Sequence, residues 1–158
     1  MANQKTEQLR AKLFNLIADY LEGVTKKVEN KVVREIQNNL DRGFEPDGTT
    51  PLKQLHPKTV AKKKKKGRVN PEAILIDTGL LYRGFYLELE RDKANMEVEL
   101  KVRNEQYYAV WHDEGQMGQH VRPNLDFPEA GNTIFDSEMF KPSSIERLRQ
   151  DVSAIINS

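Results

Sequence analysis

Residues 74–123 read ILIDTGLLYRGFYLELERDKANMEVELKVRNEQYYAVWHDEGQMGQHVRP, and this stretch decides the fold. Within it, the segments 85–90 and 96–103 alternate apolar with polar residues. Such alternation is typical of strands that have one face in a core and the other in water. The stretch 91–95 between them is short and polar, which suits the turn of a hairpin. Two antiparallel strands are therefore predicted, and their apolar face needs a cover.

A long amphipathic helix is predicted upstream, because apolar residues recur every three or four positions from Leu9 to Leu40. Its apolar stripe can cover the hairpin. Gly23 costs a helix about 1 kcal/mol relative to alanine, so a bend or a break there stays open. Gly43 is the expected stop, with Arg42 as a cation in the last turn. After Val24 the steps are nearly all four, which favours packing in the core over a coiled-coil dimer.

A second amphipathic helix is predicted from Pro142 to the end of the chain, with Ser143 or Ser144 as its N-cap and Glu146 in its first turn. The apolar residues on one side of this helix are Ile145, Leu148, Val152, Ile155 and Ile156. Together these elements predict a single α+β domain over residues 1–158. In it, the long N-terminal helix packs on a small antiparallel sheet.

A flexible basic loop is expected at about 45–73, because the segment 44–73 holds four prolines, two glycines and few large apolar residues. Eight basic residues and no acidic residue lie between Lys53 and Arg68. The whole chain has a net charge of +1, so the rest of it carries about −7 once these eight charges are subtracted. The candidates for contact with a partner or with DNA are Lys58, Lys62, Lys63, Lys64, Lys65, Lys66 and Arg68.

The composition excludes several classes of protein. The chain has no cysteine, which excludes disulfides and cysteine-ligated zinc or iron–sulfur sites. No run of 18 apolar residues occurs, and the N-terminus lacks the apolar centre of a signal peptide. We therefore expect a soluble protein with no membrane partner.

The turns within 74–123 are interpreted as architecture. In ILIDTGLL, Asp77 or Thr78 can accept backbone N–H groups, and Gly79 permits close approach of the chain. Leu80 and Leu81 are expected to anchor this turn. The segment YYAVWHDEG at 107–115 predicts one helical turn that is stopped by its glycine. The Arg122-Pro123 pair predicts an extended segment, whose arginine could pair within the chain or between subunits.

No catalytic or metal site is predicted. His112, Asp113, Glu114 and His120 lie near one another in the sequence, but neither HExxH nor a second spaced cluster accompanies them. The chain also has no GxSxG motif and no serine near either histidine. We expect a protein that is not an enzyme and that needs no metal or cofactor.

Taken in chain order, these segments resemble the phage virion morphogenesis family of tail-completion proteins. The family pattern has a "PDG…W…L…T…K" segment, an "ILIDTGxLxxS" turn, a "YAxxHxxG" turn and a closing "RPFLG" strand. The resemblance covers about residues 44–127, roughly half the chain. It departs from the pattern at Leu52 in place of tryptophan, at Gly84 in place of serine and at RPNLD in place of RPFLG. The matching residues are Pro46, Asp47, Gly48, Leu55, Thr59, Lys62, Ile74, Leu75, Ile76, Asp77, Thr78, Gly79, Leu81, Tyr108, Ala109, His112, Gly115, Arg122, Pro123 and Leu125.

The resemblance implies a tail terminator or neck protein, Mu-like, that caps the tail tube and helps to join the tail to the head. It implies further copies of the chain in a ring, for example a hexamer, and tail tube, sheath, neck or connector proteins as partners. The expected location is the tail or neck of the virion, after assembly in the cytoplasm of a bacterial host. The residues given a structural role by the family motifs are Asp47, Gly48, Leu75, Asp77, Thr78, Gly79, Leu81, Tyr108, His112, Gly115, Arg122 and Pro123.

Two roles for the basic segment stay open. In a tail ring it could face genomic DNA in the lumen or a neighbouring protein. The alternative function is a nucleic-acid-binding protein that uses Lys62–Lys66, because each lysine that neutralises a phosphate releases a counterion.

Overall fold

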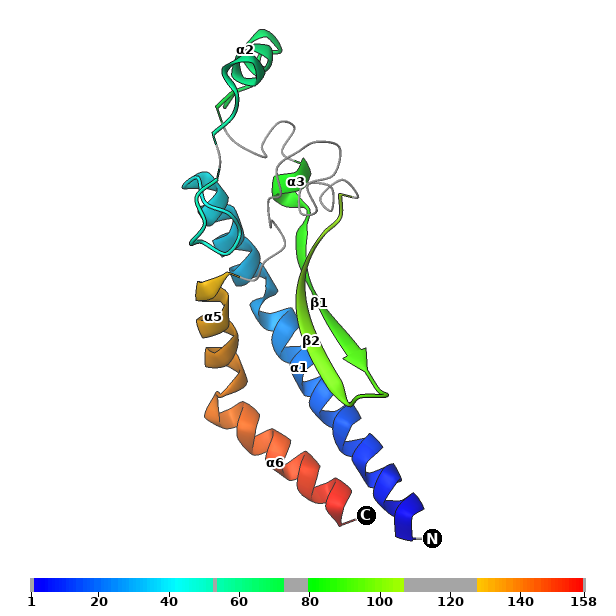
Figure 1. Ribbon diagram of the computed structural model, residues 1–158. Helices are drawn as coiled ribbons and strands as arrows, with labels where there is room; N and C mark the ends of the chain where they lie inside the picture. The colour runs from blue at the N-terminus through cyan, green and yellow to red at the C-terminus, as the bar shows by residue number, and fades with distance from the viewer. Residues whose placement is uncertain (1, 53, 73–79, 107–127, 158) are drawn as a thin grey trace.

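The computed structural model describes residues 2–52, 54–72, 80–106 and 128–157. The chain is α+β, as predicted from the sequence. A long helix forms the axis of the main body, with a hairpin along one side and two helices along the other (Figure 1). The elements are α1 (Ala2–Asp41), α2 (Pro57–Lys65), α3 (Leu80–Arg83), β1 (Phe85–Asp92), β2 (Glu97–Asn104), α5 (Glu129–Met139) and α6 (Pro142–Ile156).

Helix α1 is continuous through Gly23. It ends in a glycine-based cap in which Gly43 has a φ of +83°. The N–H of Gly43 donates to the carbonyl of Leu40 at 3.0 Å, and the N–H of Phe44 donates to that of Asn39 at 2.9 Å. These two bonds form a Schellman motif, which confirms the predicted stop. The predicted cation in the last turn is wrong, because Arg42 lies just beyond the helix.

The predicted hairpin is confirmed, with Phe85 opposite Asn104, Leu87 opposite Val102 and Leu89 opposite Leu100. Met96 was predicted to begin the second strand, but it lies in the turn with a φ of +57°. The cause is the preceding Asp92, whose carboxylate accepts the N–H groups of residues 94 and 95 and closes a tight turn. Reversing the chain in so few residues requires a left-handed residue at the end of the turn.

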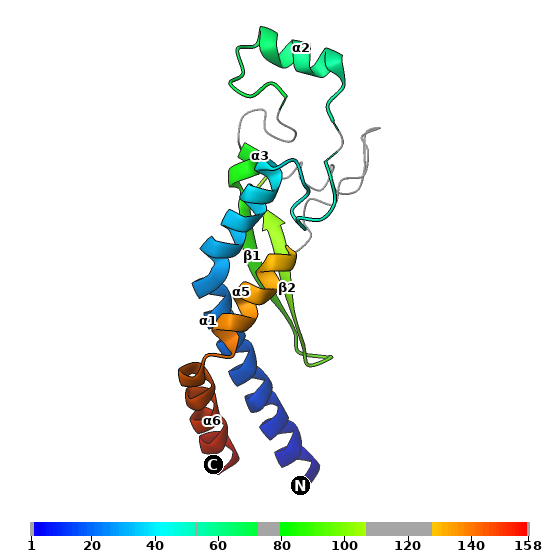
Figure 2. The same ribbon diagram turned by 90° about the vertical axis from the view of Figure 1, so that its left-hand side faces the viewer.

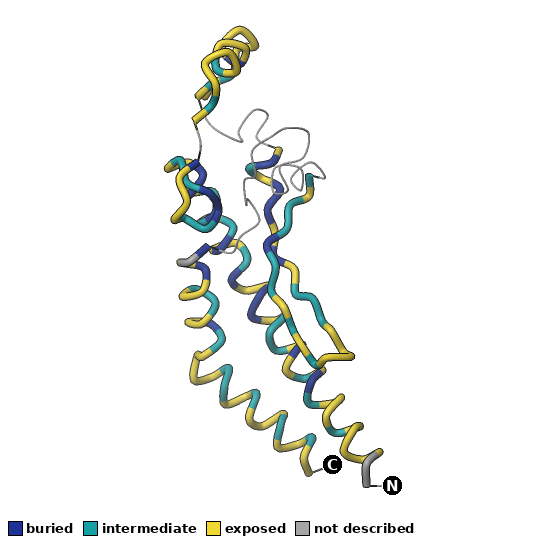
Figure 3. Tube along the Cα trace, viewed as in Figure 1, coloured by how far each residue is buried: buried dark blue, intermediate teal, exposed yellow. Residues whose placement is uncertain are grey.

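The core lies between α1 and the hairpin. Figure 3 shows the buried stretch along the middle of α1, on the length that faces the strands. Each fully buried aliphatic side chain contributes roughly 1.5–3 kcal/mol relative to exposure. The apolar stripe of α1 thus packs in the core of its own chain, which the sequence favoured over a coiled-coil dimer. The buried cluster consists of Val24, Val28, Val32, Ile36, Leu40, Leu52, Phe85, Leu87 and Val102.

Helix α5 was not predicted from the sequence. Its residues EAGNTIFDSEM include glycine, asparagine and threonine, which are weak helix formers. Tertiary contact compensates, because Ile134, Phe135 and Met139 pack against the core. In addition, the hydroxyl of Tyr20 donates to the carbonyl of Met139. A helix with low propensity can therefore persist in this place.

Helix α6 was predicted, but not its cap. The N-cap is Lys141 and Pro142 occupies the first turn, instead of a serine cap at 143 or 144. Proline is favoured at this position because its missing N–H has no partner there in any helix. Among the described residues, α6 buries none of its side chains, and Ile156 is 60 % exposed.

The short helix α3 immediately precedes the hairpin in the chain and contacts α1. Leu81 is buried, as predicted, whereas Leu80 is 48 % exposed and does not anchor the turn. The amide of Gln37 donates to the carbonyl of Tyr82 at 3.2 Å, and the Tyr82 hydroxyl donates to Asp41 at 2.8 Å. Among the described residues, no helix combines the length and the apolar character needed to cross a membrane.

Candidate functional site: a basic helix beyond the end of α1

The basic segment is not a loop throughout. Residues 57–65 form α2, which projects beyond the C-terminal end of α1 in both views (Figures 1 and 2). His56 is its N-cap, and its Nδ1 accepts the N–H of Lys58 at 3.2 Å. Pro57 follows at the first helical position. The prediction of a flexible loop over 45–73 is therefore wrong for these residues, since a proline at that position starts a helix and lysine is a good helix former.

The other end of α2 has the same kind of cap as α1. Gly67 has a φ of +69°, and its N–H donates to the carbonyl of Lys64 at 3.0 Å. The N–H of Arg68 donates to the carbonyl of Lys63 at 3.2 Å. Both ends of this helix are thus closed by local hydrogen bonds. The lysine run sits in its last turn, where cations interact favourably with the helix dipole.

The helix sorts the predicted basic residues into different environments. At 100° per residue, one exposed face of about 100° carries four lysines, here called the lysine face. Lys63 lies outside this face, about 110° around the helix from its centre, and is only 9 % exposed. Lys64 pairs with Glu72 at 3.3 Å, and Arg68 is half-buried. The structure therefore brings together four of the seven predicted contact residues, namely Lys58, Lys62, Lys65 and Lys66.

The lysine face concentrates like charge. Lys58 and Lys62 are four residues apart, as are Lys62 and Lys66, and like charges at this spacing destabilise a helix. A polyanionic partner would relieve this repulsion, whereas a neutral partner would not. The face spans roughly 12 Å along the helix axis, since each residue rises about 1.5 Å. Its chemistry suits a row of phosphates or an acidic protein surface.

The segment that leads to α2 is fixed to the end of α1. Residues 43–52 fold back on themselves, with a bridge between Phe44 and Pro51. The buried side chain of Asn39 donates from Nδ2 to the carbonyl of Pro46 at 3.0 Å. The family-motif residues Asp47 and Gly48 form the tip of this turn. They hold the start of the basic segment at a defined place.

Asp47 has an unusually low pKa. Burial works against its charged form, but the N–H and hydroxyl groups of Thr50 and Thr49 all donate to its carboxylate at 2.7–3.1 Å. These hydrogen bonds outweigh the burial and lower the pKa from 3.8 to about 2. The ionised carboxylate therefore stabilises the fold.

Asp47→Asn is expected to lower the free energy of unfolding at pH 7 by up to about 2 kcal/mol. Because the folded pKa lies below the unfolded one, this contribution is complete above about pH 4 and disappears as the pH falls through about 2. Urea titrations from pH 7 to pH 2 should show the wild-type and variant stabilities converging at the acidic end. Asp136→Asn, at an exposed position on α5, is the control and should change little. A constant gap at all pH values would contradict the role of the charge.

Gly48 and Gly23 provide a second, paired prediction with opposite signs. Gly48 has a φ of +81°, and a Cβ there would lie 2.7 Å from Nδ2 of Asn39. Gly48→Ala should therefore destabilise the protein by about 1–3 kcal/mol. A Cβ on Gly23 meets no atom within 4 Å, so Gly23→Ala should stabilise α1 by up to about 1 kcal/mol. Thermal unfolding of both variants tests this, and a loss of stability in both would contradict it.

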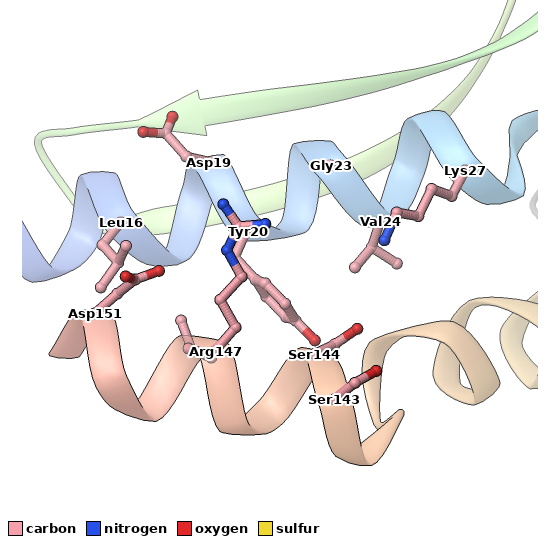
Figure 4. A pocket seen from close by; sticks show the side chains of 11 residues that line it. Leu16, Asp19, Tyr20, Gly23, Val24, Lys27, Ser143, Ser144, Arg147 and Asp151 are labelled. Atoms are coloured by element: carbon pink, nitrogen blue, oxygen red, sulfur yellow. The ribbon is translucent and has the colours of Figure 1, made fainter.

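A groove of about 560 Å³ lies between α1 and α6. Figure 4 shows Tyr20 on α1 and Arg147 on α6 pointing toward the opposite helix. Leu16, Val24 and Leu148 supply apolar walls. None of its eleven lining residues is a histidine or a cysteine, so its two serines have no imidazole base beside them. One of its carboxylates, that of Asp19, forms an ion pair with Arg91 at 2.7 Å.

Most of the other predicted site residues lie outside the described part of the chain. This is the case for Leu75, Asp77, Thr78, Gly79, Tyr108, His112, Gly115, Arg122 and Pro123. Within the described residues, no group of three or more histidine, aspartate or glutamate side chains could hold a metal ion. The interpretation of these motifs stays a prediction.

Comparisons with protein-family models, with curated proteins and with solved structures gave no match. The resemblance to tail-completion proteins therefore rests on the sequence motifs alone.

Proposed function

We propose that this protein is a structural tail-completion protein of a tailed phage or of a phage-derived particle. In this role, copies of the chain cap the finished tail tube, or occupy the neck, and help to join the tail to the head. The order of the sequence motifs supports the proposal. The structural observation that carries it is the lysine face, which is held on a capped helix beyond the end of the main body.

The arrangement suits an assembly protein. Among the described residues the core is small and is formed chiefly by α1 and the hairpin, and α6 buries none of its side chains, so much of this part of the chain is available for neighbours. A projecting helix can reach an adjacent subunit or the DNA path while the core stays unchanged. Tail tube, sheath or connector proteins with an acidic surface are the partners that its charge favours.

Deleting the gene from a phage or prophage that carries it tests the proposal directly. Electron microscopy of the lysate should show filled heads and separate tails, and a plasmid copy of the gene should restore joined particles. Normal virions without the protein would refute this function.

A non-specific nucleic-acid-binding protein is the second candidate, and the same lysine face favours it. At 3.4 Å per phosphate along one strand, a face of roughly 12 Å spans about three or four phosphates. A gel shift with random duplex DNA at two salt concentrations separates the two candidates. Strong binding by the isolated protein that falls steeply with salt would favour the second.

A further inference from the structure

Strand β2 has one edge that pairs with β1 and a second edge that points away from β1. Within the described residues the sheet has two strands, and no third strand pairs with β2. Of the two strands, β1 is the one that α1 contacts more. Figure 2 shows β2 on the side of the hairpin away from α1. An edge of eight residues offers a row of N–H and C=O groups to another strand.

The hydrogen-bond pattern shows which residues point outward. The N–H of Glu105 donates to the carbonyl of Gly84 at 2.8 Å, one step beyond the Phe85–Asn104 pair. Bonded and non-bonded pairs alternate along an antiparallel ladder. The backbone groups of the residues opposite Leu87 and Leu89 therefore point away from β1. On β2 the outward set is Val98, Leu100 and Val102.

The outer edge of β1 supports the same assignment. The N–H of Leu87 donates to the side chain of Glu29 at 2.9 Å, so it points outward and is covered by α1. The two edges of the sheet thus differ: one is partly capped by a carboxylate from α1, and the other pairs with no strand among the described residues.

The sequence of β2 is complementary to itself when it is reversed. Residues 97–103 read EVELKVR, with two acids before Leu100 and two bases after it. In an antiparallel pair centred on Leu100, Glu99 lies opposite Lys101 of a second copy, and Glu97 lies opposite Arg103 of that copy. Val98 lies opposite Val102 on the other face. Opposite charges and aliphatic pairs in facing positions stabilise a sheet.

The other registers are worse. A centre at Val98 places Glu97 opposite Glu99, and a centre at Val102 places Lys101 opposite Arg103. Leu100 is also a residue whose backbone groups point outward, so the pair at the centre of the favoured register is hydrogen bonded. One register therefore satisfies the backbone and all four charged pairs.

On the charged face of the hairpin, acidic residues lie opposite one another near the turn. In its register Glu90 faces Glu99, and Asp92 faces Glu97. Lys101 reaches Glu90 at 2.6 Å and Glu99 at 3.1 Å. Like charges in facing positions are unfavourable. A second copy in the favoured register would bring its own Lys101 and Arg103 to these acids.

We propose that β2 pairs with β2 of a second copy about a two-fold axis through Leu100, which gives a four-stranded sheet. Such a dimer closes on itself, unlike the head-to-tail contacts of a ring, so it is a state of the free protein. The proposal does not depend on the function proposed above.

Charge reversal in the full chain tests the pairing. Glu99→Lys and Lys101→Glu each place like charges in facing positions at two symmetric points. Each variant is expected to dimerise on the order of tenfold more weakly than the wild type. A mixture of the two variants restores opposite charges at both points and should form a heterodimer, as should the double variant with itself. Sedimentation equilibrium measures these four samples and the wild type.

Two results would overturn the proposal: a monomeric wild type, or single variants that both associate as strongly as the wild type. Amide hydrogen exchange of the wild type gives a readout that does not depend on any substitution. Exchange of the Leu100 and Val102 amides should slow as the protein concentration rises. Protection that is independent of concentration would show that the chain covers this edge itself, and the proposal would fail.

Discussion

Replacing the lysine face by glutamine, as Lys58→Gln, Lys62→Gln, Lys65→Gln and Lys66→Gln together, is expected to abolish the joining of tails to heads. The fold should survive, because all four side chains are exposed and glutamine is as good a helix former as lysine. Their mutual repulsion also disappears in the variant. The loss would therefore come from the missing charge, and plaque counts with electron microscopy of the lysate would measure it.

The same variant separates a nucleic-acid partner from a protein partner. If all four lysines contact phosphates, binding of duplex DNA should weaken on the order of 10³-fold, since each contact contributes a factor of about eight at about 0.1 M salt. The slope of log K against log salt should also flatten by about 0.9 per lysine removed. Unchanged DNA binding with failed joining would assign the face to an acidic protein surface.

A matched control removes the same number of positive charges from lysines outside the lysine face. Lys5, Lys12 and Lys31 are exposed on α1, and Lys93 is exposed in the hairpin turn. Their joint replacement by glutamine should leave particle joining unchanged. If both quadruple variants fail equally, the effect is one of net charge, and the lysine face has no special role. If neither fails, the face has no part in assembly.

The sequence predicts best the elements that rest on a repeated local pattern. Alternation in 85–90 and 96–103 is enough to predict the hairpin and its buried face, since the side-chain period of a strand is two, although the second strand begins one residue later, at Glu97. The three- and four-residue steps from Leu9 to Leu40 give most of α1 and its covered side, although the helix begins earlier, at Ala2. Gly43 gives the end of α1, because few other residues adopt the required positive φ.

The missed features depend on contacts or on a weaker signal. Helix α5 has poor propensity and persists through Ile134 and Phe135 in the core, which no local pattern reveals. Helix α2 did have a signal, since His56-Pro57 at its start and Gly67 at its end fit helix caps. The four prolines around it hid that signal. Lys63 is buried whereas its neighbours in the lysine run are exposed. To predict which lysine is buried, one must know how α2 lies relative to the rest of the chain, and the sequence alone does not give this.

Ile36→Ala is expected to have the largest effect on stability of any single substitution considered. Ile36 is 0 % exposed and belongs to the cluster that joins α1 to the hairpin. Truncating a fully buried isoleucine costs about 2–5 kcal/mol, because it loses apolar contact and leaves a cavity that closes only in part. For a domain of ordinary stability, about 5–15 kcal/mol, this is a large fraction of the total. Urea unfolding followed by circular dichroism measures it.

Ile17→Ala on the same helix is the matched control, because Ile17 is 44 % exposed. Both substitutions gain the same helix propensity, a few tenths of a kcal/mol, so the difference between them reports burial alone. The control should cost about 1 kcal/mol or less.

If the two variants unfold at the same urea concentration, then the stripe of α1 from Val24 to Leu40 does not form the core. Without that core, only the charged face of the hairpin would be left to stabilise it, where Lys101 and Arg103 pair with Glu88 and Glu90. Exposed ion pairs of this kind contribute little each, so they cannot replace a lost core.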